Sequence, residues 1–409
     1  MRDSLWNLRD YRLWFTADTS DVIAMTFRSF AIPLIAIALT NSESVSGILV
    51  SVEAVLVLVL SPIGGAFIDR HSRRKIMILL GMLGMLFAGI ASLLMLANRF
   101  TLIILTVLMV FFGLLQGLLG GSNDAILKSL IPTESFARAQ AVREGRESFV
   151  GMAGDAVSGL LYRVAAYMPF MASGILYGVE MVTAIFLPDD TARLTARERR
   201  PSFLQHFIEG WRWAITKKKF MQITLVGSLV NIALTALTVG APIMLAARRT
   251  DPVLIGLLGT GSGIAGFLGS LIAAKILQRI ATGRLLTFTF SFIGLCFVPM
   301  MFSDGYVVIL CCTTAVGLLL PSLNSGLVGF VFGKVPEDMQ GRASSVFETL
   351  LGAFSAVTPA ATGFILKINH GFMLLSACAF LLVLTATCIT CFASIRNIPT
   401  PNLWNSTDL

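Results

Sequence analysis

Among the charged residues inside the long apolar runs of this chain, of which only 13% is charged, five stand out by their position. They are Asp21, Arg28, Glu53, Asp155 and Glu180. A charged side chain at the centre of a membrane-spanning helix costs about 2.5–3.5 kcal/mol on insertion scales, so each needs a partner or a function. Burial favours the protonated form of a carboxyl group, whereas a nearby arginine favours the charged form. The pattern indicates proton coupling, with Asp155 as the first candidate and Asp21, Glu53 and Glu180 as the others.

The elements that hold these residues are long hydrophobic segments. The chain has 409 residues, of which 56% are hydrophobic. About 20 mostly apolar residues cross a bilayer as a helix, whereas strands of a barrel would alternate in polarity. The sequence therefore predicts an all-α membrane protein with twelve transmembrane helices. The predicted spans are 13–39, 46–68, 76–97, 101–123, 146–166, 169–187, 221–246, 253–277, 285–302, 305–332, 344–367 and 371–395.

The lysines and arginines fall mainly in the segments on one side of this arrangement. With both termini in the cytoplasm, 25 of the 31 lie in cytoplasmic segments, and the opposite orientation would invert that ratio. Cytoplasmic loops carry an excess of these residues, which favours the first orientation. We therefore expect a multi-pass protein of the cytoplasmic (inner) membrane, embedded in the lipid bilayer. The net charge of +8 then needs no nucleic-acid partner.

The predicted spans also give the depth of the five charged residues. Arg28, Asp155 and Glu180 fall near mid-depth, Asp21 lies nearer the cytoplasm, and Glu53 lies nearer the outside. Asp21 and Arg28 share a helix face but stand about 10 Å apart along the axis, too far to pair directly. We expect Arg28 to pair with Asp155 or Glu53. The alternative to proton coupling is a buried ion pair that only holds helices together.

Two sets of residues recur along the chain. IPTESFARA at 131–139 resembles VPEDMQGRA at 335–343, which lies 204 positions later. Four further pairs are 209 positions apart: Pro33 with Pro242, Gly47 with Gly256, Arg70 with Arg279, and Lys75 with Arg284. Parallel repeats of this kind place a substrate site between two halves that rock to expose it alternately. The sequence thus predicts two pseudo-symmetric six-helix bundles.

The domain boundaries follow from this repeat. We assign 1–187 to an N-terminal bundle, 188–220 to a cytoplasmic linker, 221–396 to a C-terminal bundle, and 397–409 to a cytoplasmic tail. In the linker, Phe203, Phe207, Trp211 and Ile215 recur every four residues beside basic residues. That spacing predicts an amphipathic helix on the cytoplasmic membrane surface. It would act as a tether between the bundles or as a lipid sensor.

GAFIDRHSRRK at 65–75, between predicted helices 2 and 3, resembles the loop signature of the major facilitator superfamily, with Ser72 in place of a usual glycine. NLRDYRLWFTADTSD at 7–21, the two repeated loops, and LIGLLGTGSGIAGFLGS at 254–270 resemble its macrolide-efflux and enterobactin-exporter-like branch. The resemblance covers the whole chain. It implies the twelve-helix major facilitator fold and transport by alternating access.

The resemblance also assigns a role to the loop itself. In the superfamily the loop acid packs near the cytoplasmic start of helix 11, here 341–345, and helps to hold one access state, while its arginines join a charge relay. The matching residues of this conformational gating loop are Gly65, Asp69, Arg70, Arg73 and Arg74. An acid beside a helix N-terminus gains about 0.3–1 kcal/mol, which biases two states of similar energy. The alternative is that these cations only anchor the topology.

Two departures from the superfamily pattern weaken the expectation of proton antiport. The helix 4 signature has an arginine three positions before a Gln-Gly pair, but here Gly113 precedes Gln116 and Gly117. The antiporter pattern of helix 5 has a proline where this chain has Asp155.

Substrate contacts come from helices 1, 4, 7 and 10 if the superfamily pattern holds. The cavity candidates are Phe27, Phe30, Phe111, Phe112, Gln116, Asn123, Asn231 and Asn324. A pocket of aromatic rings and isolated amides suits a bulky amphipathic solute better than a sugar, which needs more paired donors and acceptors. Ordinary helix packing explains any single one of these residues equally well.

No other chemistry is indicated. Cys388 and Cys391 have CxxC spacing but no accompanying ligands, and the three histidines are scattered. Gly261–Gly266 fits GxGxxG, yet no strand precedes it. We expect no metal, no cofactor and no enzymatic activity.

The sequence thus predicts a monomeric secondary active exporter that moves an amphipathic drug-like compound out of the cell in exchange for protons. Exporting an endogenous solute such as a siderophore or lipid is the alternative within transport. A membrane receptor or scaffold that does not transport is the alternative from another class.

Overall fold

The computed structural model describes residues 5–131, 135–188, 203–335, 339–368, 371–391 and 393–400. Over these ranges the protein is helical and has no strand. Within these ranges, eleven helices are long and apolar enough to cross a membrane. The remaining predicted span, 146–166, overlaps the second part of α6 (Phe136–Val164), which is long enough but carries several charged residues in its first half. The all-α membrane architecture predicted from the sequence is therefore confirmed.

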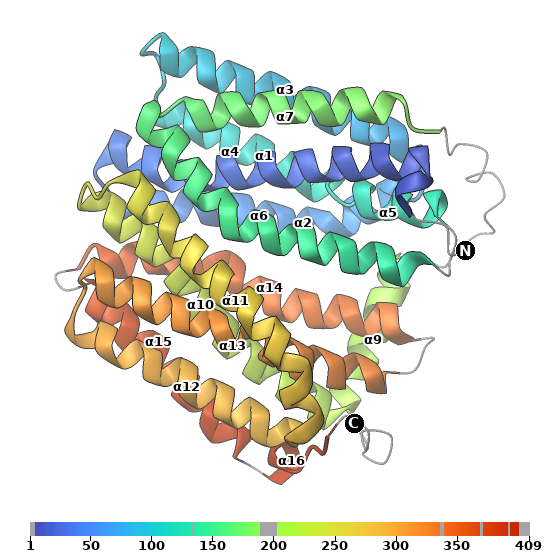
Figure 1. The fold of residues 1–409 in the computed structure, drawn as a ribbon, viewed down its shortest axis with the longest axis vertical. Helices are drawn as coiled ribbons and strands as arrows, with labels where there is room; N and C mark the ends of the chain where they lie inside the picture. Colours follow the sequence, from blue (N-terminus) through green and yellow to red (C-terminus); the bar gives the residue numbers. More distant parts are fainter. Residues whose placement is uncertain are drawn as a thin grey trace. The chain divides into compact units, whose positions relative to one another are not determined.

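The chain forms two compact units (Figure 1). Unit 1 comprises Met1–Asn41, Leu49–Arg200 and Arg249–Gly259, and unit 2 comprises Ser42–Ile48, Pro201–Arg248 and Thr260–Leu409. Short pieces of α2 and α11 thus cluster with the opposite half of the chain.

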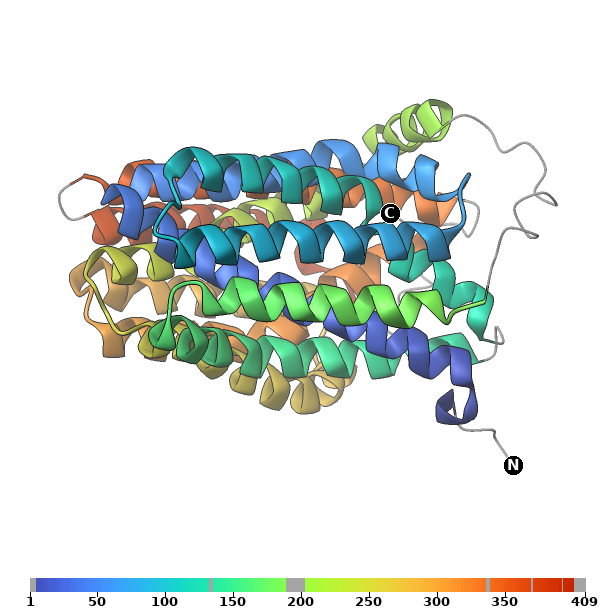
Figure 2. The ribbon, with the colours of Figure 1, turned by 90° about the horizontal axis from the view of Figure 1, so that it is seen from above.

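Unit 1 is built from the first seven helices and the start of the eleventh. Its elements are η1 (Leu5–Asn7), α1 (Arg9–Thr40), most of α2 (Glu43–Ile68), α3 (Arg73–Leu96), α4 (Leu102–Leu119), α5 (Ser122–Leu130), α6, α7 (Met168–Ile185) and the first turns of α11 (Pro252–Arg279). α7 packs against both α3 and α1 (Figures 1 and 2). α1 ends because Asn41 adopts a left-handed conformation (φ 48°), and its N–H bonds the Ile37 carbonyl at 2.8 Å.

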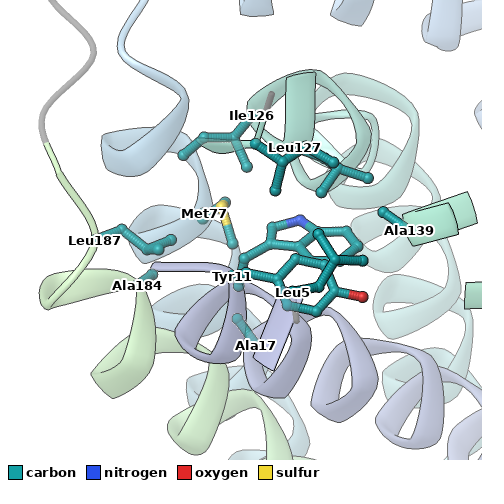
Figure 3. Close-up of a cluster of buried hydrophobic side chains, with 11 residues drawn as sticks. Leu5, Tyr11, Ala17, Met77, Ile126, Leu127, Ala139, Ala184 and Leu187 are labelled. Carbon is teal, nitrogen blue, oxygen red and sulfur yellow. The ribbon is translucent and has the colours of Figure 1, made fainter. Parts of the chain in front are cut away.

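A buried apolar cluster closes the end of unit 1 at which α1 begins (Figure 3). It joins η1, α1, α3, α5, α6 and α7, because α3 and α6 start and α7 finishes at this same end. Its members are Leu5, Tyr11, Trp14, Ala17, Met77, Ile126, Leu127, Ile131, Ala139, Ala184 and Leu187. The end of unit 1 that this cluster closes is called the α1 end below. The cluster fixes the helices around the polar site described below.

Unit 2 contains the other helices. They are α9 (Phe203–Thr216), α10 (Lys218–Ala247), most of α11, α12 (Thr282–Phe302), α13 (Tyr306–Lys334), α14 (Gln340–Leu366), α15 (Gly371–Thr390) and α16 (Ala393–Arg396). α9 lies in the segment that the sequence assigns to the linker. It packs on α14, where Gly210 lies against the Arg342 backbone and Arg342 Nη1 lies 3.1 Å from Glu209 Oε2. Ile208 and Ile215 of α9 are exposed, and its placement on a membrane surface stays a prediction.

A close helix crossing in unit 1 depends on two glycines. A Cβ added to Gly256 of α11 would strike the Asp155 carbonyl oxygen, and one added to Gly159 of α6 would strike the Pro252 carbonyl oxygen at 2.5 Å. Small residues let helix backbones approach closely inside a membrane. α6 and the start of α11 are therefore held in direct backbone contact.

Unit 2 contains an equivalent crossing between the start of α2 and α14. A Cβ on Gly47 would strike the Pro359 carbonyl oxygen, and one on Gly363 would strike the Glu43 carbonyl oxygen. The residues of the two crossings correspond by the same shifts of 209 and 204 positions found in the sequence: Glu43 with Pro252, Gly47 with Gly256, Asp155 with Pro359, and Gly159 with Gly363. The repeat is therefore expressed as two equivalent packing contacts, one per unit.

This contact gives a test on a single helix. Gly159→Ala is expected to lower the free energy of unfolding by about 1–3 kcal/mol, because the methyl group meets backbone that must move. Gly151→Ala on the same helix meets no atom within 4 Å, so it should be neutral or gain up to about 1 kcal/mol from helix propensity. Chemical unfolding in detergent micelles measures both. Equal effects of the two substitutions would contradict the crossing.

Candidate functional site

A buried ion pair joins α1 to α2 inside unit 1. Arg28 is fully buried, and its Nη2 lies 2.7 Å from Glu53 Oε1. The Arg28 guanidinium also lies over the ring of Phe112 on α4, with Cζ 4.2 Å from the ring centroid. The hydroxyl of Tyr177 on α7 lies beside the same guanidinium. Of the two partners expected for Arg28, the structure selects Glu53.

A second polar group lies about two turns along α1 from this pair. Asp21 is buried and accepts hydrogen bonds from Gln116 Nε2 at 3.4 Å and from Asn123 Nδ2 at 3.3 Å. The indole N–H of Trp14 donates to the Asn123 backbone carbonyl at 2.8 Å, which holds α5 against α1. Asp21, a predicted proton-coupling residue, therefore contacts Gln116 and Asn123, two predicted cavity residues. Both contacts are made inside the helix bundle of unit 1.

Glu180 of α7 is fully buried near this group. Asp21 and Asp18 act on it electrostatically, and the Asn123 side chain lies beside it. Neither carboxylate oxygen reaches hydrogen-bond geometry with another described residue. Glu180 is thus an acid that is enclosed by protein and lacks a cation.

Asp155 lies apart from these groups, at the α6–α11 crossing. Its side chain is half-buried against Gly259, where an added Cβ would strike Oδ2. Within the described part of the chain no basic side chain comes within salt-bridge distance of it. The expected alternative pairing of Arg28 with Asp155 is accordingly not formed.

A buried charge cluster near the α1 end was missed by the sequence interpretation. Arg146 pairs with Asp18 through Nη1, and both side chains are about 95% buried. Arg143 pairs with Asp124 and with Glu147, the latter at 2.9 Å, and lies 4.0 Å from Asp18. The cluster joins α1, α5 and α6.

The reason for the omission is physical. The predicted span begins at 146, which leaves Arg143 in the preceding loop and Arg146 at the very end of the helix, whereas α6 already begins at Phe136. Asp18 precedes Asp21 by three residues, and Arg143 precedes Arg146 by three, so each pair shares one helix face. That spacing was the available signal.

The gating-loop residues lie where α2 ends and α3 begins. Gly65 is in the last turns of α2, and a Cβ there would meet no atom within 4 Å. Asp69 and Arg70 are exposed, and Arg73 is half-buried. Arg74 Nη2 donates to the Ile185 carbonyl at 2.5 Å, so a cation satisfies the last turn of α7.

The remaining cavity candidates occupy different surroundings. Phe111 stacks on Phe87 with ring centroids 3.4 Å apart, whereas Phe27 is buried and Phe30 is half-buried. In unit 2, Asn231 Oδ1 accepts from Ser355 and from Thr235, the latter at 3.3 Å. Asn324 is exposed.

No metal site accompanies these residues in the described part of the chain, where no three or more His, Cys, Asp or Glu side chains could hold an ion together. The six cysteines are free thiols. The chemistry offered by the site is therefore that of carboxyl groups, amides and one arginine.

Comparison with solved structures finds the same fold in other proteins. The fold resembles a bacterial homologue of the iron transporter ferroportin in its inward-facing state, with a TM-score of 0.72 and 13% identity over 95% of this chain and 98% of that one. It also resembles the nucleoside transporter NupG, with a TM-score of 0.67 and 12% identity over 93% of this chain and 99% of that one. At these identities the likeness concerns the fold alone.

Sequence comparison gives the family. Tetracycline resistance protein, class C, of Escherichia coli is 25% identical over 181 residues, which span only 43% of each chain. The model of the Major Facilitator Superfamily matches residues 19–359, more than half of the chain. The protein therefore belongs to the Major Facilitator Superfamily.

Proposed function

We propose that this protein is a secondary active exporter that moves an amphipathic drug-like compound out of the cell in exchange for protons. The observation that carries the proposal is the presence of two acids, Asp155 and Glu180, without a cation partner among the described residues of a transporter bundle. An acid in such surroundings changes charge when it binds or releases a proton. It can therefore link proton movement to rocking of the bundle.

Asp155 is the proposed coupling residue. The equivalent crossing in unit 2 is built with Pro359 at the matching position, so the crossing itself does not require a carboxyl group. An ionisable side chain at this depth in the membrane is energetically unfavourable, and helix packing does not account for its presence. Half-burial against Gly259 lets protonation change the contact between α6 and α11.

Two similarities support drug efflux in particular. The tetracycline resistance relative is a resistance protein by its description, although the similar region is less than half of each chain. The sequence resemblance to the macrolide-efflux and enterobactin-exporter-like branch supports export of a bulky amphipathic solute. We propose in addition that the protein acts as a monomer in the inner membrane with both termini and the gating loop in the cytoplasm.

The test uses purified protein in liposomes with an acidic lumen. Labelled tetracycline and a panel of labelled macrolides are offered outside, and at least one is expected to accumulate inside as protons leave. A protonophore should abolish that accumulation, and protein-free liposomes should show none. Accumulation that does not depend on the pH gradient would contradict antiport. If no compound is transported from a panel that also includes siderophores and lipids, a receptor or scaffold would be favoured.

A further inference from the structure

Among the described residues, three buried oxygens on α5 and α7 have no partner within ordinary hydrogen-bond geometry. They are Oε1 and Oε2 of Glu180 and Oδ1 of Asn123, and the two side chains are neighbours. A buried acceptor without a donor costs about 1–3 kcal/mol. The Glu180 carboxyl group is therefore poorly stabilised as an anion by the groups around it.

The charges around Glu180 do not supply a counter-ion. From α1, Asp18 and Asp21 face it, and both are acids. From α3, the contact with α7 is made through Gly81 and Gly84, which lie against Tyr177 and Met181 and carry no charge.

Two arginines on helices that pack against α7 are already engaged with other acids. Arg146 of α6 pairs with Asp18, and Arg28 of α1 pairs with Glu53. On α7 itself, the neighbouring polar group is the neutral Tyr177 phenol, which lies beside Arg28.

We propose that Glu180 is a neutral carboxylic acid in this conformation, with the Asn123 side chain beside it. A fully buried carboxylate without a cation is so unfavourable that the group takes up a proton instead. The Asn123 amide donates to Asp21 at 3.3 Å, so one asparagine connects the two acids. Glu180, Asn123 and Asp21 form a buried site that stores one proton.

The stored proton can move within the site. When the proton leaves Glu180 and adds to an Asp21 oxygen, the charge of the acid pair stays at minus one and only its position changes. Asp18, one turn from Asp21 on α1, is engaged by Arg143 and Arg146, which also pair with the exposed Asp124 and Glu147 at the α1 end. The role of this proton in transport rests on the proposed function, whereas its presence on Glu180 does not.

The experiment measures the acid directly, without transport. Infrared spectra of the purified protein in detergent at neutral pH are expected to contain the C=O stretching band of a protonated carboxylic acid, which shifts in D₂O. Glu180→Gln should remove that band and leave the melting temperature unchanged, because a neutral amide replaces a neutral acid of the same shape. The matched control Glu144→Gln, at an exposed position of α6, should retain the band.

Three results would overturn the proposal. The first is a neutral-pH spectrum without an acid band, and the second is a band that persists in Glu180→Gln. The third is a cation that elemental analysis finds bound to the wild-type protein but not to Glu180→Gln, together with a lower melting temperature of that variant. Glu180 would then be a charged ligand of that cation. A liposome assay without proton coupling would refute the proposed function but leave these spectra unaffected.

Discussion

Glu53→Leu is expected to lower the free energy of unfolding by about 3–5 kcal/mol, the typical cost of removing one partner of a buried ion pair. The reason is that Arg28 is fully buried and its counter-ion is Glu53 at 2.7 Å. The Phe112 ring beneath the guanidinium offsets part of this cost, since a cation–π contact contributes about 0.5–2 kcal/mol. Denaturant titration in detergent micelles measures the loss.

Two further variants separate charge from packing. The double variant Arg28→Met with Glu53→Leu should recover most of the lost stability, because an apolar pair of similar volume is often as stable as a buried ion pair. Glu144→Leu, at an exposed position, should change stability by no more than about 0.5 kcal/mol. If the double variant were as unstable as Glu53→Leu alone, the unpaired charge would not be the cause.

Asp155→Asn is expected to abolish accumulation driven by a proton gradient while downhill movement of the same compound continues. One charge moved across 100 mV supplies about 2.3 kcal/mol, which sustains about a 50-fold substrate gradient. Without a titratable group at the α6–α11 crossing, the ratio of substrate concentrations inside and outside the liposome should fall to about 1. Liposomes with and without an imposed gradient measure both quantities.

The matched control for this variant is Asp10→Asn, in the first turn of α1 and outside the buried groups. It should keep the full driven accumulation. Unchanged accumulation in Asp155→Asn would remove this residue from the mechanism. A total loss of both driven and downhill movement would instead indicate a damaged transporter, which the melting temperature of the variant would reveal.

The helical membrane architecture could be predicted from the amino-acid sequence. A run of about 20 apolar residues crosses lipid as a helix, because every backbone N–H and C=O group is then hydrogen-bonded within its own segment. The repeat was equally readable, since Gly47 and Gly256 recur at a fixed shift and both prove to sit at close helix crossings. The five interrupting charges were visible because apolar surroundings make any charge conspicuous.

Which polar side chains pair with one another could not be predicted from the sequence and depends on how the helices pack. Arg28 could have paired with Asp155 or Glu53 on sequence grounds, and the choice depended on how α1 is rotated toward α2. A helix that is apolar on all sides carries no stripe to specify that rotation. The same uncertainty hid the Asp18–Arg146 pair, which exists because α6 extends beyond its apolar part and packs against α1. Spacing within one helix is fixed by its covalent geometry, whereas partners on separate helices are fixed by packing.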